Sequence, residues 1–494
     1  MKHTLVFSDL HLTLEAPDKG VWMRFRQRRF FIDGDFGRLV DRLLDQVADT
    51  PFEVVFNGDT FELDGANAYA RGADERPEDL GNEPSEALGL DRILRDHPGF
   101  VAALGRLLVR AERIVFVTGN HDLGLHWPTS RHVLRRHLVR AAQDAGSRSA
   151  PPALRERLVF APWFHRTPDG VYIEHGQQFD PASATPDPMM PTRDDGRGLW
   201  QSFGSAGYRH VLGGIGTMNP HNGKSFILGG VTGYAHHFFR YYFGRRRSIL
   251  KPWLLGSIRC ARHMLAQRAD HSEPGTAARW DGLARLADQT ALSAHQLRRL
   301  RGLWVRPVSD RPYAILRELW LDRVALVTLA LLVIGFTALL APGWITLLVL
   351  ALVVGALLTY ERLAPDNDLD AYQDGLCGKA AQIARITGDE VVVLGHTHRP
   401  HRARLANGGT LLNTGSWAPS FADPECTQPV DSHRTFAWIR TDGGRLVSAN
   451  LLTWQDDRIS AFDPCPTPRA RVAGAPAAAT AAAARSGLAQ TDAA

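Results

Sequence analysis

The chain has 494 residues, of which 44% are hydrophobic and 22% charged, and its net charge is +5. These are ordinary globular values, so the composition excludes a wholly disordered, collagen-like or coiled-coil protein, and the length leaves room for two or three domains. A charge of +5 spread over this length argues against a chain that wraps nucleic acid along its whole surface. The four cysteines form no CxxC pair, which argues against a disulfide scaffold or a cysteine-ligated zinc site.

The first predicted strand begins close to the N-terminus. The apolar run Leu5–Phe7 is too short for the core of a signal peptide, and polar residues follow it at once. We therefore expect a β-strand here and a catalytic portion that stays in the cytoplasm.

Short β-branched runs that end in polar or glycine-rich turns recur along the chain and predict strands. Helical stretches at Phe36–Ala48 and Gly99–Arg113 lie between the first three. Strands that alternate with helices and then follow one another in series predict a layered α/β domain with some antiparallel pairing. The predicted strands are Thr4–Ser8, Glu53–Asn57, Arg113–Thr118, Val171–Glu174, Glu390–Leu394, Thr410–Asn413, Thr435–Ile439 and Leu446–Leu452.

A long insertion interrupts the α/β pattern. We assign residues 1–180 and 367–465 to the two parts of the α/β domain and residues 181–366 to a helical insertion. Residues 466–494 are rich in Ala, Pro and Thr and are expected to be a disordered tail.

One segment of the insertion is apolar enough for a membrane. Residues 324–360 carry no charge, and Pro342-Gly343 divides them into halves of about 18 residues, near the lower limit for crossing a bilayer. Because Pro-Gly is a turn signal, we predict a transmembrane helical hairpin. Arg323 and Arg362 flank it, so the positive-inside rule places both ends, and the catalytic domain, on the cytoplasmic side. The alternative is a buried core hairpin in a soluble protein.

Another part of the insertion, residues 236–247, mixes aromatic side chains with arginine. Such a stretch can stack on single-stranded nucleic acid or lie on an anionic membrane surface. Because the hairpin follows in the same insertion, we favour the membrane as the partner over nucleic acid.

Five short segments carry Asp, His or Asn directly after predicted strands, and glycine stands beside most of these residues. Glycine lets the backbone turn tightly and present the next side chain. The segments are Asp-Leu-His at 9–11, Gly-Asp at 58–59, Gly-Asn-His-Asp at 119–122, His-Gly at 175–176 and Gly-His-Thr-His at 395–398.

These residue types are typical of a site for two metal ions. Side chains two apart on a strand point to the same face, so Asp9 and His11 can converge on one ion, and His396 and His398 can do the same. Two Asp, one Asn and four His are too many ligands for one tetrahedral ion and suit two ions that share a bridging carboxylate. Imidazole and carboxylate donors without a thiolate favour Mn, Fe or Zn over Ca.

In this order the five segments resemble the motifs of the calcineurin-like metallophosphoesterases. The resemblance covers roughly Met1–Phe179 and Asp389–Trp454. It implies a four-layer αββα sandwich with a dinuclear metal centre, in which His121 lies beside the substrate phosphate with Asp122 as its partner. Carried over by motif, it implies a first metal held by Asp9, His11, Asp59 and His398, with Asp59 bridging, and a second held by Asn120, His175 and His396.

Within this family, residues 8–11 and 58–62 resemble most closely the UDP-2,3-diacylglucosamine pyrophosphohydrolases of lipid A synthesis. Those enzymes typically carry Arg where this chain has His121, and they are shorter and lack the insertion. The resemblance therefore supports the phosphoesterase chemistry more strongly than that substrate.

The expected mechanism follows from the charge of a phosphate ester, which repels nucleophiles. Two cations on the phosphoryl oxygens cancel this charge and acidify a bridging water to hydroxide, which attacks phosphorus in line. The leaving oxygen needs a proton, and His121, oriented by Asp122, is the candidate acid. The alternative for His121 is a purely electrostatic contact with the phosphate.

The sequence thus predicts a membrane-anchored phosphohydrolase that uses two divalent cations, with Mn favoured over Fe or Zn. An insertion that holds the site against the bilayer favours a lipid-linked or amphipathic phosphoester or pyrophosphate substrate. One alternative is a tethered phosphatase or phosphodiesterase for soluble nucleotides or phosphoproteins. Another is a non-catalytic membrane scaffold, against which the complete ligand set argues.

Overall fold

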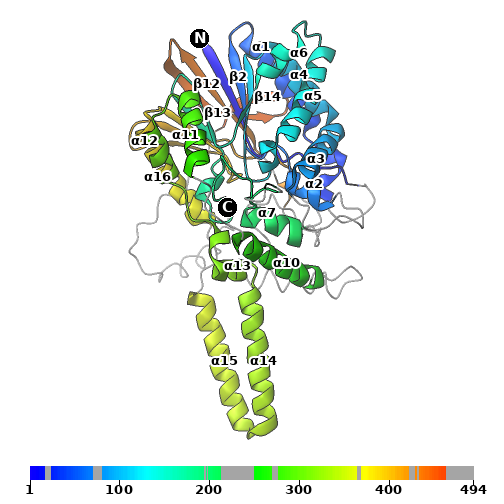
Figure 1. The fold of residues 1–494 in the computed structure, drawn as a ribbon, viewed down its shortest axis with the longest axis vertical. Coiled ribbons are helices and arrows are strands. Elements are labelled where there is room, and N and C mark those ends of the chain that lie inside the picture. Colours follow the sequence, from blue (N-terminus) through cyan, green and yellow to red (C-terminus); the bar gives the residue numbers. More distant parts are fainter. Residues whose placement is uncertain are drawn as a thin grey trace, which may run out of the picture. The chain divides into compact units, whose positions relative to one another are not determined.

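Two β-sheets form the framework of the protein in the computed structural model (Figure 1). The predicted tail (466–494) and the basic aromatic stretch (236–247) lie outside the described residues. The structure describes residues 1–16, 24–69, 81–193, 196, 198–212, 250–269, 276–363, 369–421, 429–430 and 433–462.

The first sheet has seven strands in the order β14-β13-β12-β1-β2-β3-β4. β1 to β4 pair in parallel, and β12, β13 and β14 are added by antiparallel pairing. Every residue of β2 is buried, as expected of a parallel strand that is covered on both faces. The strands are β1 Lys2–Phe7, β2 Phe52–Asn57, β3 Arg113–Val117, β4 Leu158–Ala161, β12 Arg434–Asp442, β13 Arg445–Gln455 and β14 Arg458–Ala461.

Helices α1, α3, α4 and α5 pack on one face of the first sheet. Phe7 and Phe56 point from the sheet into a core that also holds Phe36 of α1 and Phe100 of α4. The ring centroids of Phe36 and Phe100 lie 4.8 Å apart. The helices of this half are α1 Asp33–Val47, α2 Leu63–Tyr69, α3 Glu83–Asp96, α4 Pro98–Arg110, α5 Pro128–Asp144 and α6 Pro151–Glu156. Single turns are η1 Arg24–Arg26, η2 Arg28–Phe30, η4 Leu123–His126 and η5 Gln177–Phe179.

The second sheet has five strands in the order β5-β6-β7-β9-β8, and its two faces carry different contacts. Ile173 and Val393 pack against Val55 of the first sheet, so the two sheets share a core. Tyr172 and Val392 point the other way, into a core with α11, α12 and α16. The elements are β5 Phe164–Arg166, β6 Val171–Glu174, β7 Val391–Leu394, β8 His401–Arg404, β9 Thr410–Asn413, α11 Thr276–Thr290, α12 Ala294–Arg301 and α16 Leu369–Thr387. A two-stranded sheet pairs β10 Ser420–Phe421 with β11 Pro429–Val430.

The predicted α/β fold is confirmed in its coarse form, as a mixed α/β arrangement of two sheets and helices. Each predicted strand coincides with an observed one, and α1 buries Phe36, Leu39, Val40, Leu43 and Val47 at the expected helical spacing. The short strands β4, β5, β8 and β14 were not predicted from the sequence, since their runs are too brief to show a period.

The remaining helices belong to the segment predicted as an insertion. A hydrophobic cluster joins α7, η6, α10, η7, α13 and the beginning of α14, and it includes Val211, Trp253, Met264 and Ile315. α11 and α12, from the same segment, cover the second sheet instead. The bounds are α7 Phe203–Gly207, η6 Tyr208–Leu212, α10 Leu250–Ala269, η7 Val308–Asp310, α13 Pro312–Glu318, α14 Leu321–Leu340 and α15 Gly343–Leu363.

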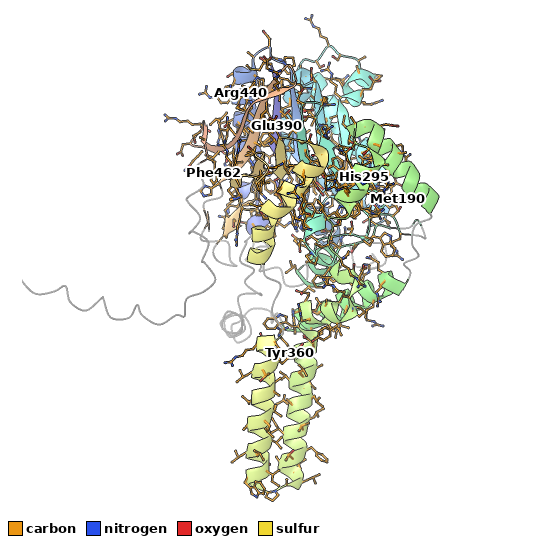
Figure 2. The ribbon with its side chains drawn as sticks, turned by 90° about the vertical axis from the view of Figure 1, so that its left-hand side faces the viewer. Met190, His295, Tyr360, Glu390, Arg440 and Phe462 are labelled. Carbon is orange, nitrogen blue, oxygen red and sulfur yellow. The ribbon has the colours of Figure 1, made fainter. Side chains whose placement is uncertain are left out.

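α14 and α15 are long and apolar enough to span a membrane. Within these two described helices only Ala330 is buried, and they lie side by side (Figures 1 and 2). Polar contacts join them near Tyr360, labelled in Figure 2: its hydroxyl bonds Asp322, and Arg323 Nε donates to Glu361 at 2.9 Å. Ala341 and Pro342 separate the two helices, so the chain turns at the predicted Pro-Gly pair, and Gly343 is the first residue of α15.

The close packing of α4 on α5 gives a test of the fold. A Cβ on Gly105 would lie 2.6 Å from the backbone carbon of Ala141, so Gly105→Ala forces the helices apart. We expect a loss of about 1–3 kcal/mol in the free energy of unfolding, measured by denaturant titration, despite the higher helix propensity of alanine. Gly378→Ala in α16 is the control, because its Cβ meets nothing within 4 Å and should leave stability equal or higher. Equal stability of both variants would contradict the packing.

Candidate metal centre

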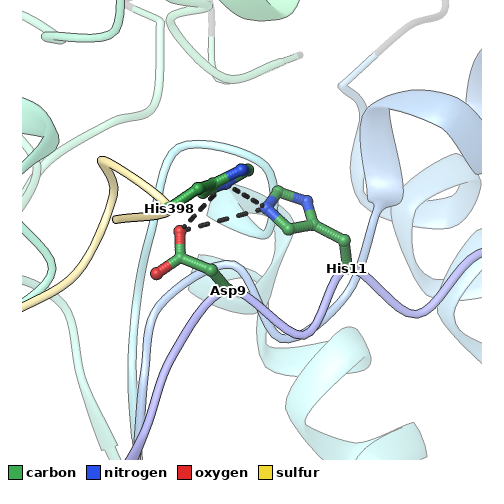
Figure 3. A group of neighbouring side chains, drawn as sticks. All are labelled: Asp9, His11 and His398. Carbon is green, nitrogen blue, oxygen red and sulfur yellow. Dashed lines mark hydrogen bonds and ion pairs between the residues drawn. The ribbon is translucent and has the colours of Figure 1, made fainter. Parts of the chain in front are cut away.

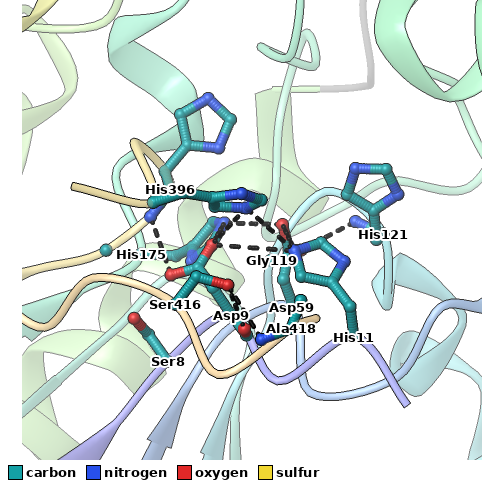
Figure 4. Close-up of polar contacts among 12 residues, drawn as sticks. Ser8, Asp9, His11, Asp59, Gly119, His121, His175, His396, Ser416 and Ala418 are labelled. Carbon is teal, nitrogen blue, oxygen red and sulfur yellow. Dashed lines mark hydrogen bonds and ion pairs between the residues drawn. The ribbon is translucent and has the colours of Figure 1, made fainter. Parts of the chain in front are cut away.

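The segments predicted to bind metal gather where strands of both sheets end. β1, β2 and β3 are parallel neighbours in the first sheet, and β6 and β7 are parallel neighbours in the second. Their carboxyl ends therefore meet at one edge, and each predicted ligand lies one to four residues beyond its strand. Figure 4 shows the side chains drawn together from these loops.

The ligands converge through the backbone rather than through strand alternation. Asp9 and His11 follow the end of β1 and have φ of 53° and 46°, and Asp59 has φ of 50°. His396 and His398, after β7, have φ of 69° and 57°. The expected reason, two side chains on one face of a strand, is thus wrong, although the residues do meet. Non-glycine residues at positive φ are costly and cluster at functional sites.

Three glycines allow the loops to approach one another. A Cβ on Gly119 would lie 2.2 Å from Asp59 Oδ1, and one on Gly395 would lie 2.7 Å from Asp9 Oδ2. On Gly58, which has φ of +78°, a Cβ would lie 2.4 Å from the His175 ring. A side chain at any of these positions would displace a predicted ligand, which explains the glycines of the sequence pattern.

Asp9, His11 and His398 form one group that could hold a metal ion (Figure 3). Asp9 Oδ1 lies 3.3 Å from His398 Nε2 and 3.9 Å from His11 Nε2, and the two imidazole nitrogens are 3.0 Å apart. The other carboxylate oxygen, Oδ2, accepts the backbone N–H of His396 at 3.0 Å. One oxygen of Asp9 is therefore fixed by the backbone while the other faces the histidines.

Asp59 belongs to two further groups, one with His11 and His121 and one with His175 and His396. Its Oδ1 accepts the backbone N–H of His121 at 2.8 Å. Its Oδ2 lies 3.0 Å from His175 Nε2 and 3.9 Å from His11 Nε2. A single carboxylate oxygen thus faces histidines on both sides, which is the position of a bridging ligand.

The histidines of the second group are oriented by partners outside it. His175 Nδ1 lies 2.9 Å from the carbonyl of Asn57, so the ring donates there and turns Nε2 toward Asp59. His396 Nε2 lies 3.1 Å from Asp180 Oδ2. Such outer partners fix the tautomer and orientation of metal-binding imidazoles.

The buried atoms without a hydrogen-bond partner include one atom on each of three predicted ligands: Asp9 Oδ1, Asn120 Oδ1 and His175 Nε2. His175 Nε2 is near Asp59, but without hydrogen-bond geometry. Buried polar atoms normally find a partner, because leaving one unpaired costs about 1–3 kcal/mol. Oxygen and imidazole nitrogen atoms in this setting fit a divalent cation. These residues can therefore hold metal.

The carboxylates of the centre stay ionised in the metal-free chain. Burial opposes the charge of Asp59, but His175 and His121 outweigh it and lower the pKa of Asp59 well below its ordinary value. Asp9 behaves alike: burial raises its pKa, and His175 and His398 reverse the shift. Both side chains are thus in the charged form that binds metal at neutral pH.

Glu62 is a buried member of the site that the sequence argument did not assign. Its Oε2 lies 3.1 Å from His11 Nδ1 and its Oε1 lies 2.9 Å from His121 Nδ1. Burial raises the pKa of Glu62, but the charge of His121 and the bond to His11 bring it far below its usual range. The carboxylate therefore orients one predicted ligand and the candidate acid together. Glu62 stands at the end of segment 58–62, so the sequence did hold a signal.

His121 lies at the outer side of this network. Its side chain is 18% exposed, whereas that of Asp59 is 1% exposed. Nδ1 also lies 3.5 Å from Asp64 Oδ2. Burial by itself lowers the pKa of His121, but the charges of Glu62, Asp59 and Asp64 raise it well above the ordinary value. These charges thus favour the protonated form of the ring.

Asp122 has a different place from the one expected. Its carboxylate accepts the backbone N–H of Thr60 at 2.8 Å and that of Gly119 at 2.7 Å, so it ties the loop after β2 to the loop after β3. The expected contact with the His121 ring is made by Glu62 and Asp64 instead. Asp122 is fully buried, and burial together with the charge of Asp59 raises its pKa to about 7. Asp122 therefore holds the loop that carries Asp59 against the loop that begins at Gly119.

Glu62, Asp64 and His121 form a fourth group with the spacing of metal ligands. Its charges are already neutralised within the protein. Glu62 bonds both His11 and His121, and Asp64 Oδ1 accepts from Arg209 Nε at 2.6 Å. We therefore assign this group to the support of the centre rather than to a separate ion.

No protein-family model matches the sequence, and no curated protein matches it with significant similarity. The geometry of the side chains is therefore what supports a metal centre here.

Glu62→Gln tests the support of the histidines. The amide keeps the shape but loses the charge, and its NH₂ group cannot accept from an imidazole N–H. We expect the affinity for Mn to fall about 10–100-fold, measured by competition with a fluorescent chelator, as is typical when an outer partner of a ligand is lost. Glu83→Gln, which changes a partly exposed acidic residue that bonds Thr129, is the matched control. An unchanged affinity in Glu62→Gln would remove Glu62 from the centre.

Proposed function

We propose that the protein is a membrane-anchored phosphoesterase with two divalent cations, Mn favoured over Fe or Zn. The observation that carries this proposal is the Asp59 carboxylate, which faces His11 on one side and His175 on the other, amid buried ligand atoms that lack partners. The packing of helices, two sheets and further helices supports the αββα sandwich of the calcineurin-like metallophosphoesterases.

Asp9, His11, Asp59 and His398 would hold one cation, and Asp59, Asn120, His175 and His396 the other. When bound, the pair supplies positive charge for the phosphoryl oxygens and acidifies a water that serves as the nucleophile. The protein supplies the rest. Asp122 and the glycines hold Asp59 between the two groups, and the buried loops keep bulk water from the ligands.

His121 is placed to act on the leaving oxygen. Its Nδ1 is held by Glu62 at 2.9 Å, so Nε2 is the nitrogen that is free to carry a proton outward. The negative charges of Glu62, Asp59 and Asp64 favour its protonated form. An imidazolium that stands over the metal ligands can donate to the departing oxygen as the bond to phosphorus breaks.

The two apolar helices support the membrane part of the proposal. α14 has 20 residues, a length of about 30 Å at 1.5 Å per residue, which equals the hydrocarbon thickness of a bilayer. Leu332, Phe336 and Leu339 are at least 66% exposed, which water would penalise and lipid would not. Arg323 and Arg362 lie at the ends that adjoin the rest of the chain, so the positive-inside rule places the catalytic part in the cytoplasm.

An anchored site favours a substrate that resides in the membrane. α7, α10 and α13 lie between the metal-binding edge of the sheets and the apolar helices (Figure 1). A lipid-linked phosphoester or pyrophosphate would reach this edge without leaving the bilayer surface. A soluble nucleotide or phosphoprotein substrate is the alternative that a comparison of substrates decides.

Asp59→Asn and His121→Gln separate the metal ligand from the acid. Asp59→Asn should bind less than one Mn per chain and lose hydrolysis of phosphodiesters, because the bridging carboxylate is gone. His121→Gln should keep its metal and lose about a hundred-fold or more in kcat, the usual contribution of a general acid. Metal content by mass spectrometry and turnover in detergent are the measurements. Full activity in Asp59→Asn would refute the dinuclear site.

Cysteine labelling tests the orientation. In a chain whose four native cysteines are replaced by serine, Gly343→Cys places a thiol at the turn between α14 and α15, and Asp310→Cys places one in η7. In intact cells a membrane-impermeant maleimide should label Gly343→Cys directly and Asp310→Cys only after lysis. Labelling of Asp310→Cys before lysis would reverse the orientation. Labelling of both only after lysis would mean that the helices do not cross the membrane.

A further inference from the structure

The segment predicted as an insertion contacts the candidate metal centre through α7 and η6. η6 is one turn of π-helix, a distortion that is frequent at functional sites. Ser205 Oγ donates to the carbonyl of Asn120 at 3.2 Å. The ring of Tyr208 meets that of His121 edge-on, with 5.8 Å between the centroids. The segment thus contacts both Asn120 and His121.

Arg209 of η6 forms a third buried link. Its side chain is 5% exposed, with Nε 2.6 Å from Asp64 Oδ1 and Nη2 2.9 Å from Glu86 Oε1. Asp64 Oδ2 in turn lies 3.5 Å from His121 Nδ1. The guanidinium therefore fixes a carboxylate that faces His121, and it separates two buried acidic groups that would otherwise repel each other.

We propose that Arg209 is a positioning residue for His121, and that η6 couples the placement of the membrane-bearing segment to the catalytic site. Arg209 acts through Asp64 and touches neither the substrate nor the metal ligands. This inference rests on the proposed function, in which His121 is the acid.

The path from η6 to the apolar helices is closely packed. A Cβ on Gly256 of α10 would lie 2.4 Å from the carbonyl oxygen of His210 and 3.0 Å from Val211 Cα, so the two backbones are in direct contact. Val211 shares a hydrophobic cluster with α10 and α13, and Val324 of α14 packs against the same cluster. A displacement of α10 therefore has to move η6, because packed cores do not deform continuously.

The first test compares two aryl diesters in the full-length protein in detergent. Bis(4-nitrophenyl) phosphate has a leaving group that needs no proton, and diphenyl phosphate has a more basic one that does. If Arg209 positions the acid, Arg209→Met should lower kcat on diphenyl phosphate about ten-fold or more and change the other substrate by less than about three-fold, with Mn content unchanged. Arg209→Lys should recover part of the loss. Equal losses on both substrates would overturn the proposal.

Arg166→Met is the matched control. Arg166 pairs with buried Asp389 through Nε at 3.0 Å and Nη2 at 2.8 Å, so its loss breaks a comparable ion pair away from the centre. It should lower stability without the leaving-group effect. Because unpaired buried carboxylates can prevent folding, the same assay uses Arg209→Met combined with Asp64→Asn and Glu86→Gln, which leaves no unpaired charge and should show the same substrate pattern.

A double-mutant cycle tests whether Arg209 acts through His121. In a His121→Gln background the effect of Arg209→Met on diphenyl phosphate should vanish, because both changes remove the same proton donation. An undiminished effect would show that Arg209 acts elsewhere and would overturn the proposal.

Hydrogen–deuterium exchange of the metal-free protein tests the coupling between η6 and His121 without an activity assay. Gly256→Ala and Arg209→Met should both raise exchange in the peptide 119–126, whereas Gly282→Ala, whose Cβ meets nothing within 4 Å, should not. Unchanged exchange in both variants would overturn the inference. If the wild type hydrolyses no diester, the proposed function fails, and the exchange result still decides whether Arg209 positions His121.

Discussion

The carboxylate of Asp59 is the element on which the rest of the site depends. One oxygen is occupied by the backbone N–H of His121, so the other alone faces His11 and His175. This division requires the loops after β1, β2, β3 and β6 to meet within a few ångströms. The close approach requires glycine where two loops touch and a positive φ at several predicted ligands. The strain of these conformations is offset by the stability of the buried sheets.

The charges around the centre are arranged in two tiers. The inner carboxylates, Asp9 and Asp59, have lone pairs directed at the cluster of histidines, while Glu62 and Asp64 lie outside and orient the imidazoles. The inner tier brings several imidazoles beside two buried carboxylates, and these are the donor types that bind a divalent cation. The outer tier is already neutralised by His121 and Arg209. Metal binding can thus belong to the inner residues and proton donation to His121, and Glu62 contacts both through His11 and His121.

The mixed α/β fold and the gathering of the candidate ligands at one edge could be predicted from the sequence, because both depend on local patterns. Buried strands show as β-branched runs, and polar residues after parallel strands meet at one edge of a sheet. The roles of Glu62, Asp64 and Arg209 depend on contacts between distant segments, which leave no periodic trace. Asp122 shows the same limit, since its type and position suggested a partner for His121 while its carboxylate in fact binds two backbone amides. The positive φ of Asp9 and His11 likewise could not be predicted from strand alternation.

The most direct test of the central claim is anomalous X-ray scattering at the manganese edge from crystals of the Mn-loaded protein. The account predicts two peaks on opposite sides of the Asp59 carboxylate, one beside Asp9, His11 and His398 and one beside Asn120, His175 and His396. A single peak among Glu62, Asp64 and His121, or no peak near Asp59, would contradict it.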